Sequence, residues 1–370
     1  MRLLLAGGGT AGHISPGLAV AERLLQQDPA PEVHFVCSER ALDARMLSSA
    51  GLPYHPLPCG PFPYGVSPAA ARAGLRLLSS VRAARRLLMR LRPEAVLGVG
   101  GFVSVPVVIA ARLAHLPVAI HVLDAQPDRA NRLASRWSEW ITLAFAEAAR
   151  HFPSAHVEVT GCPVRRRILE TVRPAALEAL GLDPAKLTLL VMGGSQGARR
   201  LNQALVGVLP QVLGTLDAQV LHLTGERDYE QVLADSGPAA ALHGGYQAFP
   251  FAEDMGSVLA AADLVISRAG SSSLAETAAR GCPQILVPYP HAGGHQMANA
   301  QALARAGAAV VLPDEQCEPA ALLHMLTRLL RNEPERLAMS RAAYRWASPH
   351  AAKRLAEGLR ALVRHQPPSS

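Results

Sequence analysis

The chain has 370 residues, of which 49% are hydrophobic and only 4% are aromatic. A chain of this length usually builds more than one hydrophobic core, so we expect two domains. The formal net charge of +7 predicts an anionic partner: a nucleic acid, an acidic lipid or a diphosphate. The sequence has no apolar stretch of bilayer-spanning length and too few residues before its first glycines for a signal-peptide core, so we expect neither segment.

The first 17 residues predict a strand, a glycine-rich loop and a helix. The stretch LLLAGGGTAGHISPG begins with an apolar run that is typical of a buried parallel strand, and helical spacing of apolar residues begins after Gly17. This order of elements directs free N–H groups at an anion. Gly7, Gly9 and Gly12 satisfy the pattern G-x-G-x-x-G, which is weak evidence alone, and a tight turn without a ligand is the alternative.

The same pattern recurs in the middle of the chain, over residues 187–209 (LTLLVMGGSQGARRLNQALVGVL). Apolar segments alternate with helical or loop-like sequence throughout, which predicts parallel sheets. We therefore expect an α/β protein with two doubly wound, Rossmann-like domains, residues 1–163 and 164–345, facing a cleft. Ligands of such sheets bind at the carboxyl ends of the strands, so loops from both domains would line the cleft.

A third loop, SRAGSSSLAE, follows the apolar segment ADLVI and precedes a helix that we expect to begin near Leu274. Its three consecutive serines offer N-cap hydroxyls and free N–H groups to an anion. Glu276 has two readings: a capping-box partner of Ser273, or a bidentate acceptor for a sugar diol.

No acidic residue occurs between Asp43 and Glu94, an interval that is rich in arginine. From residue 77 to residue 92, helical spacing separates an apolar face from a face that carries Arg82, Arg86 and Arg90. We expect the apolar face to pack in a core and the arginine face to meet an anionic membrane surface. Phe62, Tyr64, Val66 and Leu75 would add apolar contact with the lipid.

Neither a metal nor another cofactor is expected. The five cysteines are scattered and never in C-x-x-C spacing, which predicts reduced, mostly buried thiols in the cytosol. His291 and His295 are four apart, but two glycines between them disfavour a helix and no third ligand is near. A D-x-D motif that would hold a divalent ion on a nucleotide diphosphate is also missing.

Six motifs occur in order and carry a resemblance: GGGTAGHISPGLAVA, GGFVSVP, GCPVR, GGSQGAR, SRAG followed by Glu276, and GHQMANA. From Leu3 to about Gly307 the chain resembles the N-acetylglucosaminyltransferases of peptidoglycan synthesis, in glycosyltransferase family 28 with the GT-B fold. The resemblance implies inverting transfer of N-acetylglucosamine from its UDP donor to the muramoyl-pentapeptide diphospho-undecaprenol lipid, which turns lipid I into lipid II. It places the enzyme peripherally on the cytoplasmic face of the inner membrane.

The resemblance also assigns roles to the two domains. The C-terminal domain would bind the nucleotide sugar and the N-terminal domain would meet the lipid acceptor. A C-terminal helix of about residues 346–365 would pack back on the N-terminal domain. His13 corresponds to the histidine that helps to deprotonate the acceptor, and unperturbed imidazole has a suitable pKa for a base near pH 7. The alternative for His13 is a helix N-terminal residue bonded to a neighbouring loop.

Carried over by position, the residues that contact UDP-N-acetylglucosamine are Thr10, Ala11, Gly12, Asp124, Arg165, Ser195, Ala252, Ser271, Ser272, Ser273, Leu274, Ala275, Glu276 and Gln296. The chain departs from the family at HVLD, where the usual pattern is His-Glu-Gln-Asn. Val122 and Leu123 remove a carboxylate and an amide, and Asp124 can accept but not donate hydrogen bonds when ionised. The sugar contact at Asp124 is therefore in question.

Two other classes of function compete with a glycosyltransferase. A dinucleotide-dependent oxidoreductase would use the loop of Gly7, Gly9 and Gly12, with Glu39 as the ribose acid, but the duplicated glycine loop argues against it. A nucleic-acid-binding protein would use the arginine stretch, but the low aromatic content and the lack of a recognised motif argue against that. We therefore expect no nucleic-acid partner.

Overall fold

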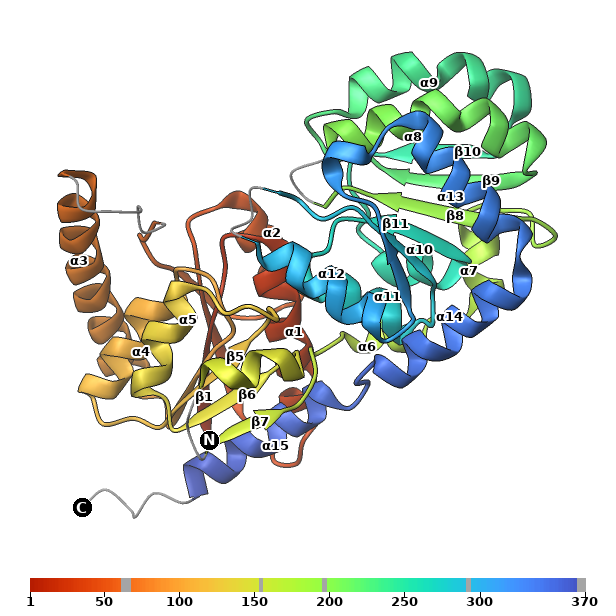
Figure 1. The fold of residues 1–370 in the computed structure, drawn as a ribbon. Helices are drawn as coiled ribbons and strands as arrows, with labels where there is room; N and C mark the ends of the chain where they lie inside the picture. The colour runs from red at the N-terminus through yellow and green to blue at the C-terminus, as the bar shows by residue number, and fades with distance from the viewer. Residues whose placement is uncertain (61–67, 153–155, 195–197, 291–293, 365–370) are drawn as a thin grey trace. The chain divides into compact units, whose positions relative to one another are not determined.

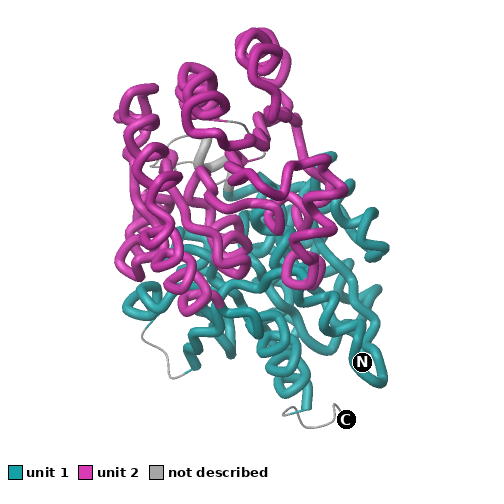
Figure 2. Tube along the Cα trace, turned by 90° about the vertical axis from the view of Figure 1, so that its right-hand side faces the viewer, with its two compact units in different colours: residues 1–165, 348–370 teal, residues 166–347 magenta. Residues whose placement is uncertain are grey.

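The computed structural model divides into two compact units, which Figure 2 colours separately. Unit 1 contains Met1–Arg165 and Ser348–Ser370, and unit 2 contains Arg166–Ala347. Each unit is built around one parallel sheet with helices, so the prediction of an α/β fold with two doubly wound domains is confirmed. The structure describes residues 1–60, 68–152, 156–194, 198–290 and 294–364, without the side chains of 68–73.

The sheet of unit 1 has seven strands in the order β3-β2-β1-β4-β5-β6-β7 (Figure 1). Every pairing within it is parallel, and Leu5 of β1 lies between Phe35 of β2 and Leu97 of β4. Its strands are β1 Arg2–Ala6, β2 Glu32–Cys37, β3 Tyr54–Pro56, β4 Ala95–Gly98, β5 Val118–Val122, β6 Trp140–Leu143 and β7 Val157–Val159.

The helices of unit 1 cover both faces of this sheet. They are α1 Ala11–Leu25, α2 Ala41–Ser49, α3 Pro68–Leu91, α4 Ser104–Leu113, α5 Arg129–Ala134 and α15 Ala351–Arg364, with short 3-10 turns at Ser135–Trp137 and Ala146–His151. Alternate residues of β1 enter different cores: Leu3 and Leu5 pack with α1, α2 and α15, whereas Leu4 and Ala6 pack with α3 and α4. Burial on both faces explains why β1 is apolar at every position after Arg2.

Helix α1 begins earlier than the sequence predicts. The apolar spacing places its start after Pro16 and Gly17, but the structure begins it at Ala11, with Thr10 in extended backbone as the N-cap. Pro16 is tolerated inside the helix, and the carbonyl that its missing N–H would have met belongs to Gly12. This earlier start puts His13 in the first turn of the helix.

The C-terminal helix α15 belongs to unit 1, although unit 2 intervenes in the sequence. Its Leu355, Ala356 and Leu359 are buried in the same core as α1. Gly358 leaves room for the Trp140 ring, which a Cβ at that position would overlap. On the exposed side, Arg354 forms an ion pair with Glu158 of β7.

The sheet of unit 2 has six parallel strands in the order β10-β9-β8-β11-β12-β13. They are β8 Leu187–Met192, β9 Ala218–Leu223, β10 Tyr246–Phe249, β11 Leu264–Ser267, β12 Gln284–Leu286 and β13 Ala309–Val311. The helices of the unit are α6 Arg166–Glu170, α7 Arg173–Ala179, α8 Arg199–Pro210, α9 Tyr229–His243, α10 Met255–Ala261, α11 Ser271–Ala279, α12 His295–Arg305, α13 Pro319–Arg331 and α14 Glu333–Trp346. A π-helical turn, Gln211–Thr215, continues α8, and a 3-10 turn spans Asp314–Gln316.

Apolar side chains of α8 and α13 pack on one face of this second sheet, around Leu189 and Val191 of β8. Leu190, between them and facing the other side, is equally buried. The strands of unit 2 are therefore also covered on both faces, as the continuous apolar runs predict. Within the described part of the chain, no helix is long and apolar enough to cross a membrane.

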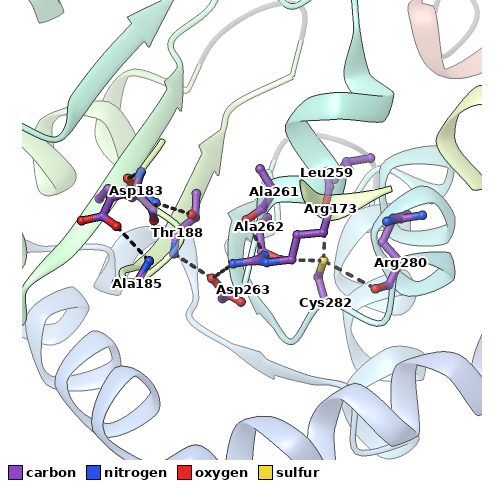
Figure 3. A network of polar contacts seen from close by, with 11 residues as sticks. Arg173, Asp183, Ala185, Thr188, Leu259, Ala261, Ala262, Asp263, Arg280 and Cys282 are labelled. Atoms are coloured by element: carbon purple, nitrogen blue, oxygen red, sulfur yellow. Dashed lines mark hydrogen bonds and ion pairs between the residues drawn. The ribbon is translucent and has the colours of Figure 1, made fainter. Parts of the chain in front are cut away.

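A polar network closes the amino ends of β8 and β11 (Figure 3). One carboxylate oxygen of Asp263 accepts hydrogen bonds from the Thr188 backbone N–H at 2.8 Å and from Arg173 Nη2 at 2.7 Å. The Arg173 guanidinium also donates to the carbonyl of Ala261, the last residue of α10. The Cys282 thiol lies against the neighbouring Ala262 carbonyl, and burial raises the pKa of this thiol to about 12. The network thus satisfies backbone groups that the ends of a strand and a helix leave unpaired.

We predict that Asp263→Ala destabilises unit 2, because it leaves the N–H of the buried Thr188 without an acceptor. Such a loss costs about 1–3 kcal/mol, and thermal unfolding followed by calorimetry measures it. The control is Lys186→Ala, which breaks an exposed ion pair with Asp217 in the same unit and leaves the midpoint at the wild-type value. Equal midpoints for Asp263→Ala and wild type would contradict the prediction.

Candidate active site

The loops that carry the predicted residues of unit 1 follow the carboxyl ends of its central strands. The first glycine loop links β1 to α1, and a second loop, Val99–Val103, links β4 to α4. Because all strands of the sheet are parallel, these loops meet at one edge. Asp124 lies at the same edge, two residues after β5, and is half-buried.

The glycines of the first loop are required by close packing within unit 1. A Cβ on Gly7 would lie 2.5 Å from Val99 Cγ2 and 2.8 Å from the His13 carbonyl oxygen. A Cβ on Gly8 would overlap the Asp43 carboxylate, and one on Gly9 would lie 3.0 Å from the Phe102 ring. The sequence suggested that these glycines let N–H groups reach an anion. The structure shows that these glycines also leave room for the side chains of Val99, Asp43 and Phe102.

Two N–H groups of the loop are already engaged. The Gly7 N–H donates to the Val36 carbonyl at 3.0 Å, and the Gly9 N–H donates to Asp43 Oδ2 at 2.8 Å. A dinucleotide pyrophosphate would have to compete with the Asp43 carboxylate for the Gly9 N–H. Glu39, the ribose acid of the oxidoreductase alternative, is exposed. The positive end of the α1 dipole lies at the first turn of the helix, Thr10–His13, whereas the Gly7 and Gly9 N–H groups are already paired.

His13 is held on one side by Thr10, with Oγ1 and Nδ1 3.0 Å apart. Its ring lies against the second loop: a Cβ on Gly100 would come within 2.9 Å of His13 Cδ2, and Gly101 is similarly close to Nδ1. Ser104 fixes that loop by accepting from the Gly100 N–H at 3.1 Å and donating to the Ala6 carbonyl at 2.7 Å. The alternative for His13 was a helix N-terminal residue bonded to a neighbouring loop. His13 does lie in the first turn of α1 and packs on Gly100 and Gly101, but the side chain that its Nδ1 contacts is Thr10. This arrangement is compatible with a catalytic role.

The departure from the family pattern lies on β5 and just after it. His121 is fully buried, and burial lowers its pKa to about 3, so the imidazole is neutral at physiological pH. The Thr142 hydroxyl donates to the Ile120 carbonyl, so His121 Nδ1–H donates to Thr142 Oγ1. Val122 and Leu123 are also buried, in the interior of unit 1. This stretch is therefore structural up to Asp124.

In unit 2, the serine-rich helix α11 begins at Ser271, three residues before the predicted start. Its N-cap is Gly270, and no side chain caps it. Ser273 is therefore inside the first turn, and the proposed capping box with Glu276 is wrong. Ser271, Ser272 and Glu276 are buried.

Leu274 and Ala275 are buried as well, and the Leu274 N–H donates to the Gly270 carbonyl within the helix. The hydroxyl and carboxylate groups in the first half of this helix are those of Ser271, Ser272, Ser273 and Glu276, and the Thr277 hydroxyl that follows is buried without a hydrogen-bond partner in the described part of the chain.

Gln296 connects two loops at the carboxyl edge of the second sheet. Its Oε1 accepts from the Ala269 N–H after β11, at 3.2 Å, and from the Tyr289 N–H after β12, at 2.9 Å. Asn299, one turn further along α12, donates to the Ala269 carbonyl at 3.1 Å. The side-chain oxygen of Gln296 is therefore committed to shaping the loop before α11.

Arg268, inside the SRAG motif, was not predicted as a site residue. Its guanidinium donates to the Val287 carbonyl and to the Asp314 carboxylate, and lies 5.6 Å from the centre of the Tyr289 ring. It thereby joins the segments that follow β11, β12 and β13. The motif itself was the available signal, but its partner in the sequence, Asp314, is 46 residues away.

A second missed group ties helix α8 to strands β9 and β10. Asn202 Nδ2 donates to the Thr224 carbonyl and to Asp228, while Asn202 Oδ1 accepts from His222 Nε2 at 3.1 Å. The Tyr246 hydroxyl then donates to His222 Nδ1 at 2.9 Å. Burial lowers the pKa of His222 to about 3, so this neutral tautomer persists over the physiological pH range. The network fixes the helix that follows the second glycine loop.

The other predicted contacts have simpler surroundings. Ser195 lies outside the described residues. Ala252 follows β10 and precedes α10, so it lies at the carboxyl edge of the second sheet. Arg165 is the last residue of the first segment of unit 1, and its Nε is buried without a hydrogen-bond partner in the described part of the chain.

Helix α3 has the two faces that its spacing predicts. Leu88 and Ala84 are buried, whereas Arg82, Arg86 and Arg90 are exposed. Leu75, Leu78 and Met89 are exposed as well. Leu75, Leu78, Arg82 and Met89 recur at helical spacing, so arginines and apolar side chains share the outer surface of this helix. Phe62, Tyr64 and Val66 lie outside the described residues.

Among the described residues, no group of three or more histidine, cysteine, aspartate or glutamate side chains is placed to hold a metal ion. All five cysteines are free thiols; Cys59 is half-buried and the other four are buried, as predicted. Burial raises the pKa of Cys37 and of Cys59 to about 12, so both are protonated at neutral pH.

Family models match both units. The N-terminal domain of glycosyltransferase family 28 matches residues 3–142, and the C-terminal domain of the same family matches residues 188–357. The chain belongs to glycosyltransferase family 28. The resemblance inferred from the six motifs is thereby confirmed.

Relatives within family 28 match along nearly the whole chain. A protein of Desulforudis audaxviator, named UDP-N-acetylglucosamine–N-acetylmuramyl-(pentapeptide) pyrophosphoryl-undecaprenol N-acetylglucosamine transferase, is 40% identical over 93% of this chain and 93% of its own. A protein of Halothermothrix orenii with the same name is 38% identical over 95% of this chain and 96% of its own. The crystal structure of Acinetobacter baumannii MurG matches with a TM-score of 0.74 and 30% identity, over 97% of this chain and 99% of that chain.

We predict that Glu276→Ala weakens UDP binding at least tenfold while the protein stays folded. Hydrogen bonds from two ribose hydroxyls to a buried carboxylate are worth about 1.5–3 kcal/mol each, and α11 holds this carboxylate away from solvent. Titration calorimetry with UDP measures the loss. The control, Glu230→Ala on the exposed side of α9, keeps wild-type affinity. Unchanged affinity in Glu276→Ala would contradict the ribose assignment.

Proposed function

We propose that this chain transfers N-acetylglucosamine from UDP-N-acetylglucosamine to muramoyl-pentapeptide diphospho-undecaprenol, with inversion at the anomeric carbon. The observation that carries the proposal is the 40% identity, over 93% of both chains, to a transferase named for this reaction. Relatives at this identity over this length commonly share both fold and chemistry, and the first turn of α1, the loop Val99–Val103 and the start of α11 lie at the carboxyl edges of the two parallel sheets.

His13 is the group that would take the proton from the attacking acceptor hydroxyl. When its Nδ1–H donates to Thr10 Oγ1, the lone pair of Nε2 is available as a base. The positive end of the α1 dipole lies at the first turn of the helix, beside His13, and would attract the diphosphate of the lipid acceptor. Thr10, Ala11 and Gly12 would face the diphosphates of both the donor and the lipid acceptor.

The donor would bind at the carboxyl edge of the sheet in unit 2. Glu276 would accept hydrogen bonds from the ribose, and the serines of α11 with the N-terminus of that helix would meet the diphosphate. Gln296, Ala252, Arg165, Asp124 and Ser195 complete the proposed donor contacts. Leaving-group charge would be stabilised by hydroxyl groups, N–H groups and helix dipoles.

The two units would bind different substrates. Residues 1–163, with the C-terminal helix of about residues 346–365, would serve the acceptor and the membrane, and residues 164–345 would serve the donor. The assay that tests the function measures UDP release from UDP-N-acetylglucosamine with and without a lipid I analogue. UDP release that depends on the lipid supports the proposal, and equal release without it contradicts the acceptor.

We further propose that α3 docks the enzyme peripherally on the anionic cytoplasmic face of the inner membrane, because its acceptor is tethered there. The outer surface of α3 combines arginines with exposed Leu75, Leu78 and Met89, so it offers both charge attraction and apolar contact. No nucleic acid is needed to explain the basic stretch.

Replacing His13 tests the acceptor role. We predict that His13→Ala lowers kcat by about 10²-fold or more, the usual scale for a lost general base, while UDP affinity stays within twofold of wild type. Steady-state kinetics and UDP titration give the two quantities. A variant with wild-type turnover, or one that loses UDP binding, would refute the role.

The arginine face of α3 is tested by the triple variant Arg82→Gln, Arg86→Gln, Arg90→Gln. We expect its binding to anionic vesicles to fall several-fold or more, and high salt to weaken wild-type binding similarly, because the attraction is screened beyond about 8–10 Å. Sedimentation with anionic and neutral vesicles measures this, with UDP affinity as the control for folding. Full vesicle binding by the triple variant would place the membrane surface elsewhere.

A further inference from the structure

Two residues at the start of α2 hydrogen-bond to both backbone polar groups of Gly9, its N–H and its carbonyl. Asp43 Oδ2 accepts from the Gly9 N–H at 2.8 Å, and Arg40 Nη1 donates to the Gly9 carbonyl at 2.5 Å. The two side chains are three residues apart, at the N-cap and in the first turn of α2, so they reach the loop from one side. Gly9 lies between β1 and α1, outside any strand or helix, so these two side chains bond its backbone instead of a strand or helix partner.

Asp43 is built into the loop rather than placed on its surface. It is fully buried, and its Oδ2 also accepts from the Ser38 N–H at 3.1 Å and from the Ser38 hydroxyl at 2.6 Å. Gly8 has φ +156°, and a Cβ there would overlap the carboxylate, so a glycine is needed at this position to leave room for Asp43. The carboxylate therefore determines the path of the chain through Gly8 and Gly9.

That path sets the position of His13. Gly9 has φ +91° and precedes Thr10, the N-cap of α1 that contacts His13 Nδ1. A change in the backbone dihedral angles of Gly9 would move Thr10 and so change its contact with His13 Nδ1. Misplacing a catalytic group by about 1 Å can cost about 10²-fold in rate.

We propose that Arg40 and Asp43 are positioning residues for His13 and that they act through the backbone N–H and carbonyl of Gly9. The proposal rests on the function proposed above, in which His13 is the base. Neither side chain needs to touch substrate for this role. Arg40 holds the carbonyl, Asp43 holds the N–H, and together they keep Thr10 within hydrogen-bond distance of the imidazole.

Arg40 gives the sharper test, because it is an exposed residue outside the hydrophobic cores, so its removal leaves those cores intact. We expect Arg40→Ala to lower kcat about tenfold or more, with the KM for UDP-N-acetylglucosamine and the melting temperature unchanged. Arg40→Lys, which can still donate to the Gly9 carbonyl, should recover part of kcat. The matched control is Arg45→Ala, a second exposed arginine on the same helix, which should keep wild-type kinetics.

A double-variant experiment separates positioning from direct contact with substrate. If Arg40 acts through His13, then adding Arg40→Ala to His13→Ala lowers kcat no further. A second full loss of kcat in the His13→Ala background would overturn the proposal and make Arg40 a substrate contact. Wild-type kcat in Arg40→Ala would overturn it as well.

Asp43→Asn gives an independent check on the other half of the contact. The amide oxygen can replace Oδ2, and the amide nitrogen would occupy the place of Oδ1, which has no hydrogen-bond partner in the described part of the chain. Combined with Arg40→Ala, the Asp43→Asn change should lower kcat by less than the product of the single effects, because both side chains hold the backbone of the same residue, Gly9. Multiplying effects would overturn the shared mechanism.

The His13 imidazole resonances in NMR spectra provide a readout besides activity. They should shift in Arg40→Ala and stay in place in Arg45→Ala, and unchanged resonances in both would overturn the proposal. Failure of the proposed function looks different: wild-type protein would then release no UDP in the presence of the lipid I analogue, whatever the state of Arg40.

Discussion

Parallel pairing is the constraint on which the rest of this structure depends. When all strands of a sheet run the same way, their carboxyl ends share one edge, and each crossover returns to the opposite edge before the next strand begins. Residues far apart in the sequence, such as Thr10, Gly100 and Asp124, are thereby collected at one edge of the first sheet. The same rule collects Ala252 after β10, Ala269 after β11 and Tyr289 after β12 at one edge of the second sheet. The opposite edge can then be closed by purely structural groups, such as Arg173 and Asp263.

The sequence predicts the strands well because their burial on both faces leaves long apolar runs. It predicts the helix starts less well, since the usual N-cap signal is missing. Gly270 has no side chain to cap α11, and no side chain caps α1, where the Thr10 hydroxyl meets the His13 ring instead. The sequence also did not show why the first loop needs its glycines. Asp43 and Phe102 leave room only for glycine at positions 8 and 9, and they lie more than 30 and 90 residues away in the sequence. The spacing of residues within the loop therefore could not reveal this requirement.

Buried polar groups fix the candidate site more than its exposed residues do. Asp43 in unit 1 and Gln296 in unit 2 each use a single side-chain oxygen to hold backbone N–H groups of a loop. An acceptor that is buried and charged, or that receives two N–H groups, costs free energy to remove, so these loops have few alternative conformations. Such preorganisation suits a reaction whose leaving charge is stabilised by hydroxyl groups and fixed dipoles.

Helix α15 makes unit 1 discontinuous in the chain, and this has a consequence for synthesis on the ribosome. Leu355, Ala356 and Leu359 fill the core around β1 and α1, but they emerge only after all of unit 2. The N-terminal unit therefore cannot complete its core as it is translated, whereas the contiguous residues 166–347 can. The order of folding is expected to reverse the order of translation, so that a chain truncated before α15 carries a finished second unit and an open apolar surface on the first.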